Sequence, residues 1–115
     1  MDKVVGSFQV KSADDKAFGV NHLYHIWPNM EGPHKIVDLP TIRFQKGPIR
    51  ENDINGITEE CLIEILIDRL KAFQKTKFAN RFNREALNNL YAVRGNLNDR
   101  TAERNVRGVE GLNRV

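Results

Sequence analysis

Cysteine is nearly absent from this sequence, which has a single one, Cys61, among 115 residues. A lone thiol excludes a disulfide framework and a thiolate metal cluster. Cys61 lies in the first turn of a predicted helix, a position that can lower the pKa of a thiol, but the neighbouring Glu59 and Glu60 oppose that effect. We therefore expect Cys61 to pack as a small, unreactive hydrophobe, with a reactive thiol as the alternative.

Long apolar runs are missing as well. No segment approaches the ~20 apolar residues of a membrane-spanning helix. The first residues, MDKVVGSFQVKSADDK, lack the continuous apolar stretch of a secretory signal, so we expect a cytosolic protein with no membrane partner. Apolar residues make up 40% of the chain and charged residues 29%, which argues against disorder, and the length predicts one domain.

Charge of one sign is in only modest excess. Residues 1–57 hold seven Lys or Arg and seven Asp or Glu, whereas residues 58–115 hold eleven and eight. The positive excess of the second half suits an anionic partner. A net charge of +3 is nevertheless far weaker than the basic stripes of dedicated DNA-binding proteins. A small phosphate-bearing ligand is therefore favoured over a DNA or RNA polymer.

Patterns typical of catalysis or metal binding are also lacking. His22 and His25 would point to opposite faces of a strand, and no carboxylate at ligand spacing joins them or His34. The sequence has no glycine-rich phosphate loop, nucleophile elbow or zinc-protease helix. Glu64 and Asp68 lie one helical turn apart, but a solvated helix face explains both, because nothing nearby would separate their pKa values. We predict no catalytic residues, no metal site and no cofactor.

The second half of the chain predicts two long helices. Residues 58–77 and 81–107 are separated by three residues, so the helices must run antiparallel, with Thr58 and Asn80 as N-caps. A weak point is expected at Gly95. Each helix has one partner, so we expect self-association to cover the remaining apolar surface. Apolar residues recur at three- and four-residue steps at Leu62, Ile63, Leu66, Ile67, Leu70 and Phe73, and at Ala86, Leu87, Leu90, Val93 and Leu97.

The first half of the chain is punctuated by glycine and proline and predicts a small antiparallel sheet. The candidate strands are residues 4–10, 18–27, 35–39 and 41–45. Taken together, the sequence predicts an α+β protein in which the sheet region, residues 1–57, packs on a helical hairpin, residues 58–115. We expect the two parts to form one domain and the chain to be oligomeric.

Six short motifs occur in order along this sequence, namely FQKGPIRE at residues 44–51, Asn55-Gly56, LIDRL at residues 66–70, Phe73-Gln74, Arg100-Thr101 and RGVEG at residues 107–111. This ordered set resembles that of a phage family. The chain is similar to the phage Thoeris anti-defence proteins, which share their hairpin domain with the anti-CBASS cyclic-nucleotide sponges. The resemblance covers residues from about 24 to 111, and the first 20 residues show none. Where family members carry a bulky apolar residue and a tryptophan, this chain has Arg94, Gly95 and Asn96.

The resemblance implies a non-enzymatic role. Family members bind the cyclic nucleotide messengers of bacterial immunity and withhold them from their effector. The Thoeris-directed members take up cyclic ADP-ribose isomers, and relatives bind cyclic di- or trinucleotides. The family also implies homo-oligomers, such as dimers or hexamers, with pockets between subunits. The expected location is the cytoplasm of the infected bacterial host.

By motif position, the resemblance assigns ligand binding to Phe73, Asn83 and Arg100, with an aromatic ring and a guanidinium clamping an adenine. Each residue has a structural alternative. Phe73 also continues the apolar stripe, Asn83 is an alternative helix cap, and Arg100 has possible ion-pair partners in Asp99 and Glu103. Arg104 joins the binding set as a possible pyrophosphate contact, the alternative being that it lies on a solvated face.

Two other functions remain open from the sequence. One is a sponge for cyclic di- or trinucleotides only. The other is a structural or regulatory phage protein whose hairpin docks a protein partner through the same apolar stripe.

Overall fold

The computed structural model of the chain describes residues 1–17, 19–30 and 39–108. The chain divides into two compact units, Met1–Ile57 and Thr58–Val115. The first unit holds an antiparallel sheet and the second a pair of helices, so the predicted α+β class is confirmed. Among the described residues, no helix combines the length and apolarity needed to cross a bilayer.

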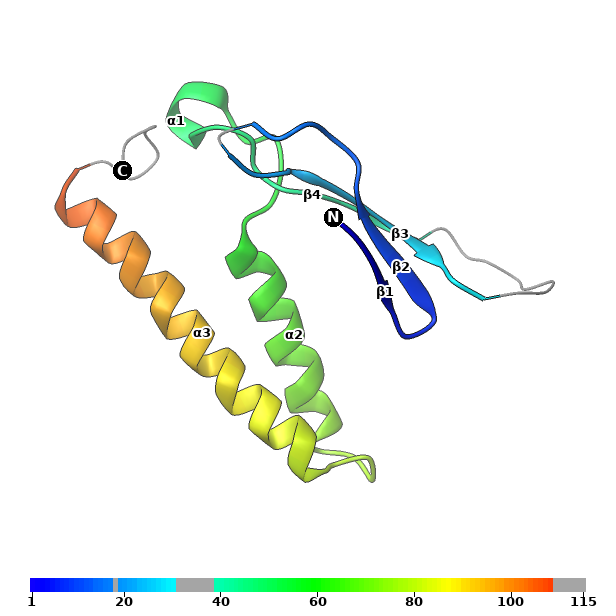
Figure 1. Cartoon of the computed structure of the whole chain (residues 1–115). Helices are drawn as coiled ribbons and strands as arrows, with labels where there is room; N and C mark the ends of the chain where they lie inside the picture. Colours follow the sequence, from blue (N-terminus) through cyan, green and yellow to red (C-terminus); the bar gives the residue numbers. More distant parts are fainter. Residues whose placement is uncertain (18, 31–38, 109–115) are drawn as a thin grey trace. The chain divides into compact units, whose positions relative to one another are not determined.

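The sheet of the first unit has four strands in sequence order. These are β1 (Asp2–Val5), β2 (Phe8–Ser12), β3 (Leu23–Pro28) and β4 (Thr41–Arg43), each antiparallel to the next (Figure 1). The prediction of a single strand over residues 4–10 was wrong, because the chain reverses between Val5 and Phe8, which face each other across the ladder. Gly6 permits this two-residue turn with a φ of +58°.

Two further strand predictions require correction. The strand predicted over residues 18–27 begins only at Leu23, because the chain first closes a small bridge between Ala17 and Val20 around Gly19, which has a φ of +84°. The strand predicted over residues 41–45 ends at Arg43, and Phe44 instead pairs in parallel with Ile57. Residues 18 and 35–38 of the predicted strands lie outside the described residues.

The segment after β4 folds into a loop tied by two amide side chains. Gln45 donates from Nε2 to the carbonyl of Asp53 at 2.7 Å and accepts the N–H of Asn55 at 2.9 Å. Asn55 in turn bonds both backbone groups of Lys46, at 2.7 and 2.8 Å. A short helix that the sequence did not predict, α1 (Ile49–Asn52), lies inside the loop. The FQKGP and Asn55-Gly56 motifs therefore have a structural role.

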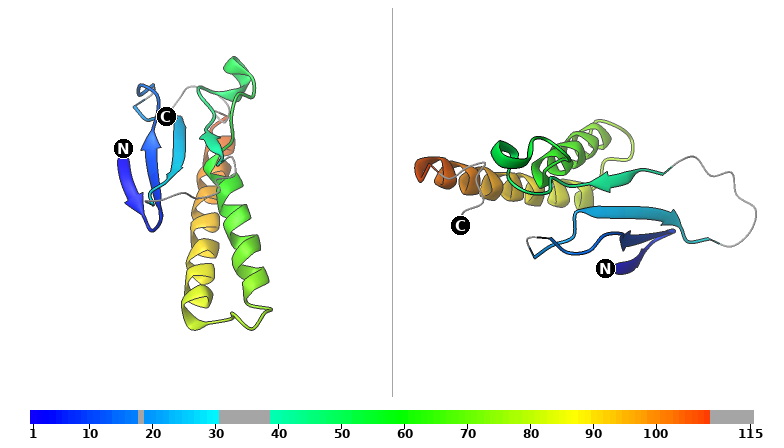
Figure 2. Two further views of the ribbon diagram at one scale, coloured as in Figure 1. Left: turned by 90° about the vertical axis from the view of Figure 1, so that its right-hand side faces the viewer. Right: turned by 90° about the horizontal axis from the view of Figure 1, so that it is seen from above.

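The second unit is a hairpin of α2 (Glu59–Phe73) and α3 (Arg81–Val106), which lie side by side in Figure 2. α2 ends four residues before the predicted end at residue 77. The Thr76 hydroxyl donates to the Phe73 carbonyl at 2.7 Å, and the Gln74 side chain bonds both backbone groups of Asn80 at 3.1 Å, so the loop replaces the last helical turn. Thr58 and Asn80 occupy the predicted N-cap positions, and α3 continues through Gly95.

The contact between the two helices follows a regular repeat. The less exposed residues of α3 alternate at steps of four and three, as in a coiled-coil seam. Leu66 and Phe73 of the predicted α2 stripe are exposed. Ala86 and Val93 of the predicted α3 stripe are exposed too, and the seam of α3 runs through Arg94 instead. Glu64 of α2 neutralises that arginine at 2.8 Å from Nε. The seam residues of α3 are Asn83, Leu87, Leu90, Arg94, Leu97, Thr101 and Arg104.

Many apolar side chains of the hairpin lie outside this seam. Among the described residues, Ile67 of α2 is the one buried hydrophobic residue, at 2% exposure. Exposed large apolar residues on or beside the two helices are Ile65, Leu66, Phe73, Phe78, Phe82, Tyr91, Val93 and Val106. A single chain therefore leaves substantial apolar surface uncovered.

Candidate ligand site

A hollow of about 310 Å³ lies where the start of α2 meets the end of α3. Its lining combines two carboxylates, two guanidiniums and two hydroxyls, so both anionic and cationic groups of a ligand would find partners there. The predicted binding residues Arg100 and Arg104 both belong to it. The full lining is Thr58, Glu59, Glu60, Arg100, Thr101 and Arg104.

Arg100 forms ion pairs across the hairpin. Its Nη2 donates to Oε1 of Glu60 at 2.7 Å and lies 3.8 Å from Oε2 of Glu59. The alternative partners considered from the sequence, Asp99 and Glu103, were therefore wrong. Neighbours along one helix are visible in the sequence, whereas the pairing of Arg100 with α2 depends on the register between the helices. Glu59 and Glu60 are consequently site residues that the sequence did not reveal.

Glu60 is held in its ionised form. Burial alone would raise the pKa of its carboxyl, but hydrogen bonds from its own backbone and from Thr58, together with the charge and hydrogen bond of Arg100, lower that pKa overall. At neutral pH the carboxylate is therefore charged and paired. Such a group is poorly suited to general acid catalysis, which requires a raised pKa.

Phe73 lines a second hollow, of about 290 Å³, at the other end of α2. Its side chain is 38% exposed, so the alternative that it belongs to the core does not hold. The guanidinium carbon of Arg69 lies 5.5 Å from the ring centroid, within cation–π range. The other residues around the hollow are Asp68, Ala72 and Thr76.

Asn83 lies at the same end of the hairpin as Phe73, as the third residue of α3. It is not the helix cap, because its backbone N–H donates to Oδ1 of Asn80 at 2.8 Å, which makes Asn80 the cap. The side chain of Asn83 occupies the first position of the half-buried seam of α3.

The hollows of Phe73 and Arg100 are separate within one hairpin. Arg100 is paired with Glu60, and Phe73 follows Glu60 by thirteen positions along α2. At about 1.5 Å per residue this separation is roughly 20 Å, far more than the thickness of a base. One chain therefore cannot close both groups on the same purine, and a clamp made from them needs two chains.

Cys61 follows Glu60 in the first turn of α2. It is exposed, so the expectation that it packs as a buried hydrophobe was wrong. Oγ1 of Thr58 lies 3.5 Å from its Sγ. Hydrogen bonds from the side chain and backbone of Thr58 lower the pKa of the Cys61 thiol, against smaller opposing effects of burial and of Glu60.

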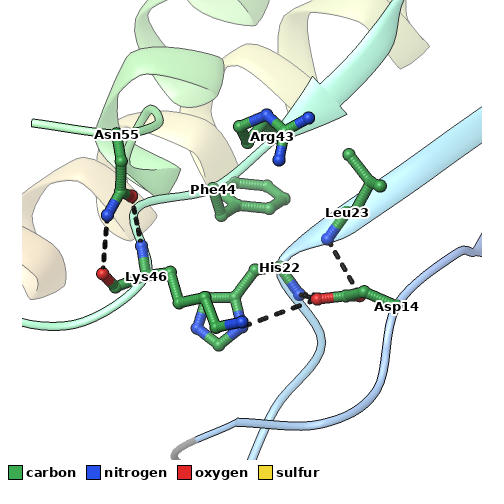
Figure 3. A pocket seen from close by; sticks show the side chains of 7 residues that line it. All are labelled: Asp14, His22, Leu23, Arg43, Phe44, Lys46 and Asn55. Carbon is green, nitrogen blue, oxygen red and sulfur yellow. Dashed lines mark hydrogen bonds and ion pairs between the residues drawn. The ribbon is translucent and has the colours of Figure 1, made fainter.

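The first unit has a hollow of its own, of about 270 Å³, shown in Figure 3. Two cationic side chains, Arg43 and Lys46, lie in its lining with the ring of Phe44, which packs edge-on against Tyr24 at 5.7 Å. The remaining lining residues are Asp14, His22, Leu23 and Asn55.

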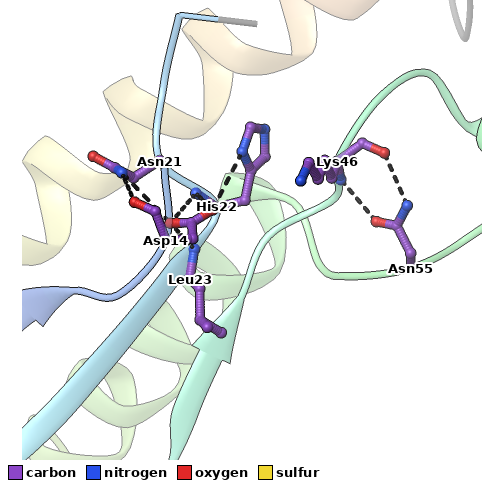
Figure 4. A network of polar contacts seen from close by, with 6 residues as sticks. All are labelled: Asp14, Asn21, His22, Leu23, Lys46 and Asn55. Atoms are coloured by element: carbon purple, nitrogen blue, oxygen red, sulfur yellow. Dashed lines mark hydrogen bonds and ion pairs between the residues drawn. The ribbon is translucent and has the colours of Figure 1, made fainter. Parts of the chain in front are cut away.

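The carboxylate of Asp14 anchors the start of β3 (Figure 4). It accepts the backbone N–H groups of His22 at 3.1 Å and Leu23 at 3.1 Å, while Asn21 donates to the Asp14 carbonyl at 2.6 Å. Burial acts to raise the pKa of the Asp14 carboxyl, but the backbone hydrogen bonds of Leu23 and His22, with a longer one from Nδ2 of Asn21 to Oδ1 at 3.5 Å, lower that pKa overall. The Asp14 carboxylate therefore stabilises the backbone at the start of β3.

His22 immediately precedes β3 and is 7% exposed, with Nδ1 3.9 Å from Oδ2 of Asp14. The expectation that it shares a strand with His25 was therefore wrong. His34 lies outside the described residues. Within the part of the chain that the structure describes, no three His, Cys, Asp or Glu residues are grouped as metal ligands.

Comparison with known proteins agrees with the resemblance seen in the sequence. The family model described as "Acb2/Tad1, hairpin domain" matches residues 37–94. A protein named "Thoeris anti-defense 1", from Bacillus phage SBSphiJ7, is 47% identical over 73 residues, which cover 64% of this chain and 51% of that protein. The chain thus spans about half the length of this curated relative. Because the family model covers half of the chain, this protein belongs to the Acb2/Tad1 hairpin-domain family.

Proposed function

We propose that this protein is a phage anti-defence sponge that binds a cyclic nucleotide immune messenger, a cyclic ADP-ribose isomer, and withholds it without cleaving it. The name of the Bacillus phage relative supports the anti-defence role. The expected site of action is the cytoplasm of the infected bacterium.

The observation that carries the proposal is the placement of an exposed ring and an arginine hollow at opposite ends of one hairpin. A ring and a planar cation can each stack on a purine, and an aromatic ring contributes about 1 to 3 kcal/mol per base. In our proposal two antiparallel hairpins bring Phe73 and Asn83 of one chain to Arg100 and Arg104 of another. The pocket is then complete only in a dimer or a hexamer.

The exposed apolar residues beside the seam support this association. Ile65 is 56% exposed and Leu66 46% exposed on α2, and a second copy of the hairpin would cover them. The same surface also suits the alternative function, a structural or regulatory phage protein that docks a protein partner. A sponge restricted to cyclic di- or trinucleotides is the alternative of the same class.

Calorimetric titration with a cyclic ADP-ribose isomer, a cyclic dinucleotide and a cyclic trinucleotide tests the proposal. We expect heat with the first and, after boiling the complex, release of the same compound unchanged. Release of an altered compound would indicate an enzyme. No heat with any of the three would reject the sponge function, and heat with only the other two would favour the alternative sponge.

Replacing Phe73 by alanine tests the position of the pocket. Loss of one stacking surface should weaken binding by about 1 to 3 kcal/mol while the oligomer, measured by sedimentation, remains intact. Phe78→Ala is the matched control, because Phe78 is another exposed ring beside a cation, with Nζ of Lys77 5.3 Å from its centroid, in the loop between the helices. Equal affinities for the two variants would place the pocket elsewhere.

A further inference from the structure

We propose that Glu60 is a positioning residue that determines how Arg100 meets the ligand. Its carboxylate engages Nη2, one of the three nitrogens on the edge of the guanidinium, so that the planar face of Arg100 is presented to a purine and this part of the edge is withheld from phosphate. The inference rests on the proposed function and adds to it the group that orients Arg100.

The geometry of the ion pair carries this inference. An arginine binds phosphate through the N–H donors on its edge, whereas it stacks on a base through its face. The Nη2 group of Arg100 is already engaged by Glu60 at 2.7 Å, with Glu59 at 3.8 Å. A phosphate approaching Nη2 would have to displace a carboxylate. A purine lying on the face would leave the ion pair intact.

The charges of the hollow lead to the same conclusion. Two glutamates and two arginines line it, so their formal charges cancel. The hollow therefore offers little net attraction to a bare polyphosphate, and stacking on a base would add affinity that charge does not supply.

The neighbouring ion pair provides a matched control. Glu64 lies one helical turn after Glu60 on α2 and pairs with Arg94 of α3 at 2.8 Å. It is absent from the linings of the hollows around Arg100 and Phe73, and the Arg94 guanidinium packs over the ring of Tyr91 at 5.1 Å. Neutralising Glu64 removes a comparable cross-helix charge pair away from the proposed site.

The test uses the full chain as wild type, Glu60→Gln and Glu64→Gln, with thermal unfolding to confirm that each variant folds. Each is titrated with a cyclic ADP-ribose isomer at low and high salt, and with inorganic pyrophosphate. Because glutamine cannot hold the guanidinium edge as a carboxylate does, Glu60→Gln should bind the messenger about tenfold more weakly. Its freed edge should make binding more sensitive to salt and increase affinity for pyrophosphate. Glu64→Gln should bind the messenger and pyrophosphate with the affinities of the wild type.

Three results would overturn the inference. Unchanged messenger affinity in Glu60→Gln would show that the carboxylate does not position Arg100. Tighter messenger binding would identify Glu60 as a competitor of the ligand. Equal pyrophosphate affinity in wild type and Glu60→Gln would show that the edge was not blocked. The pyrophosphate arm is independent of the sponge function: a wild-type protein that binds no messenger rejects that function, whereas a pyrophosphate gain confined to Glu60→Gln still supports the blocked edge.

Discussion

The thiol of Cys61 combines exposure with a neighbouring hydroxyl, and this pair has a chemical consequence. Thr58 lowers the pKa of the thiol by favouring the thiolate, which is the nucleophilic form. In the folded protein, Thr58→Val should slow alkylation of Cys61 by iodoacetamide by about threefold near neutral pH, as measured by intact mass. Thr58 makes no side-chain capping bond, so the helix should remain intact.

Unfolded protein provides the control for this measurement, because the hydroxyl no longer faces the sulfur once the helix is lost. In strong denaturant the two proteins should react at the same rate. A folded variant that reacts as fast as the wild type would show that the hydroxyl does not influence the thiol.

Gly56 shows how closely two backbones approach in the first unit. A Cβ at this position would lie 2.4 Å from the carbonyl carbon of Phe44 and 2.5 Å from its oxygen. The two segments cannot separate easily, because the N–H of Gln45 bonds the carbonyl of Ile57 at 2.8 Å and the N–H of Ile57 bonds the carbonyl of Arg43 at 2.9 Å. Gly56→Ala should therefore destabilise the first unit by about 1 to 3 kcal/mol.

Trp27, the one tryptophan of the chain, lies on β3 and reports on this unit. Denaturant unfolding followed by its fluorescence should give a lower midpoint for Gly56→Ala. An unchanged midpoint would mean that the loop yields to the methyl group and that the close approach does not restrict the sequence.

At the scale of elements, the helices could be predicted more completely than the strands. The spacing of Ile63, Ile67 and Leu70 placed α2 on the correct face, and Asn80 marked the start of α3. The end of α2 was missed because the side-chain bonds of Gln74 and Thr76 act between residues that helix periodicity does not relate. Residues 4–10 form parts of two strands because Gly6 permits a turn between them, and the alternation of apolar and polar residues along a strand does not reveal such a turn.

The candidate site, too, could be predicted only in part. Phe73, Asn83 and Arg100 were assigned from motif position, and Arg104 was added as a possible pyrophosphate contact. Glu60 could be identified only from the register of α2 against α3. Arg94 is the clearest case. Its charge argued against a place in the helix contact, and only the cross-helix partner Glu64 accounts for its position in the seam.

Gly95 of α3 offers a test at this scale. The position is helical, and an added Cβ would meet nothing within 4 Å apart from the helix itself. Gly95→Ala should therefore stabilise the hairpin by about 0.5 to 1 kcal/mol, since alanine loses less backbone entropy than glycine. Denaturation followed by circular dichroism at the helical band measures the change.

The opposite outcome at Gly95 would also be informative. Destabilisation accompanied by a smaller particle in sedimentation would mean that another chain approaches the helix at this glycine. Destabilisation without a change of size would contradict the open surroundings of the position.

At the scale of the whole molecule, the separation of Phe73 and Arg100 within one hairpin predicts a result that a pocket within one chain could not give. Phe73→Ala and Arg100→Ala should each remove the messenger binding of wild-type affinity when prepared alone. Mixing the two variants under conditions that exchange subunits should restore some of it, because a mixed dimer contains one pocket with both defects and one with neither. For a symmetric dimer after full exchange, about one quarter of the wild-type sites should return.

The ligand stoichiometry of the mixture, measured by calorimetry before and after exchange, distinguishes the possible arrangements. Recovered sites with wild-type affinity require that ring and guanidinium come from different chains. If each chain instead carried a complete pocket, every pocket in the mixture would keep one defect, and no exchange time would restore binding. The double variant Phe73→Ala/Arg100→Ala mixed with wild type completes the test, since its mixed dimers contain two singly defective pockets and should lose sites as exchange proceeds.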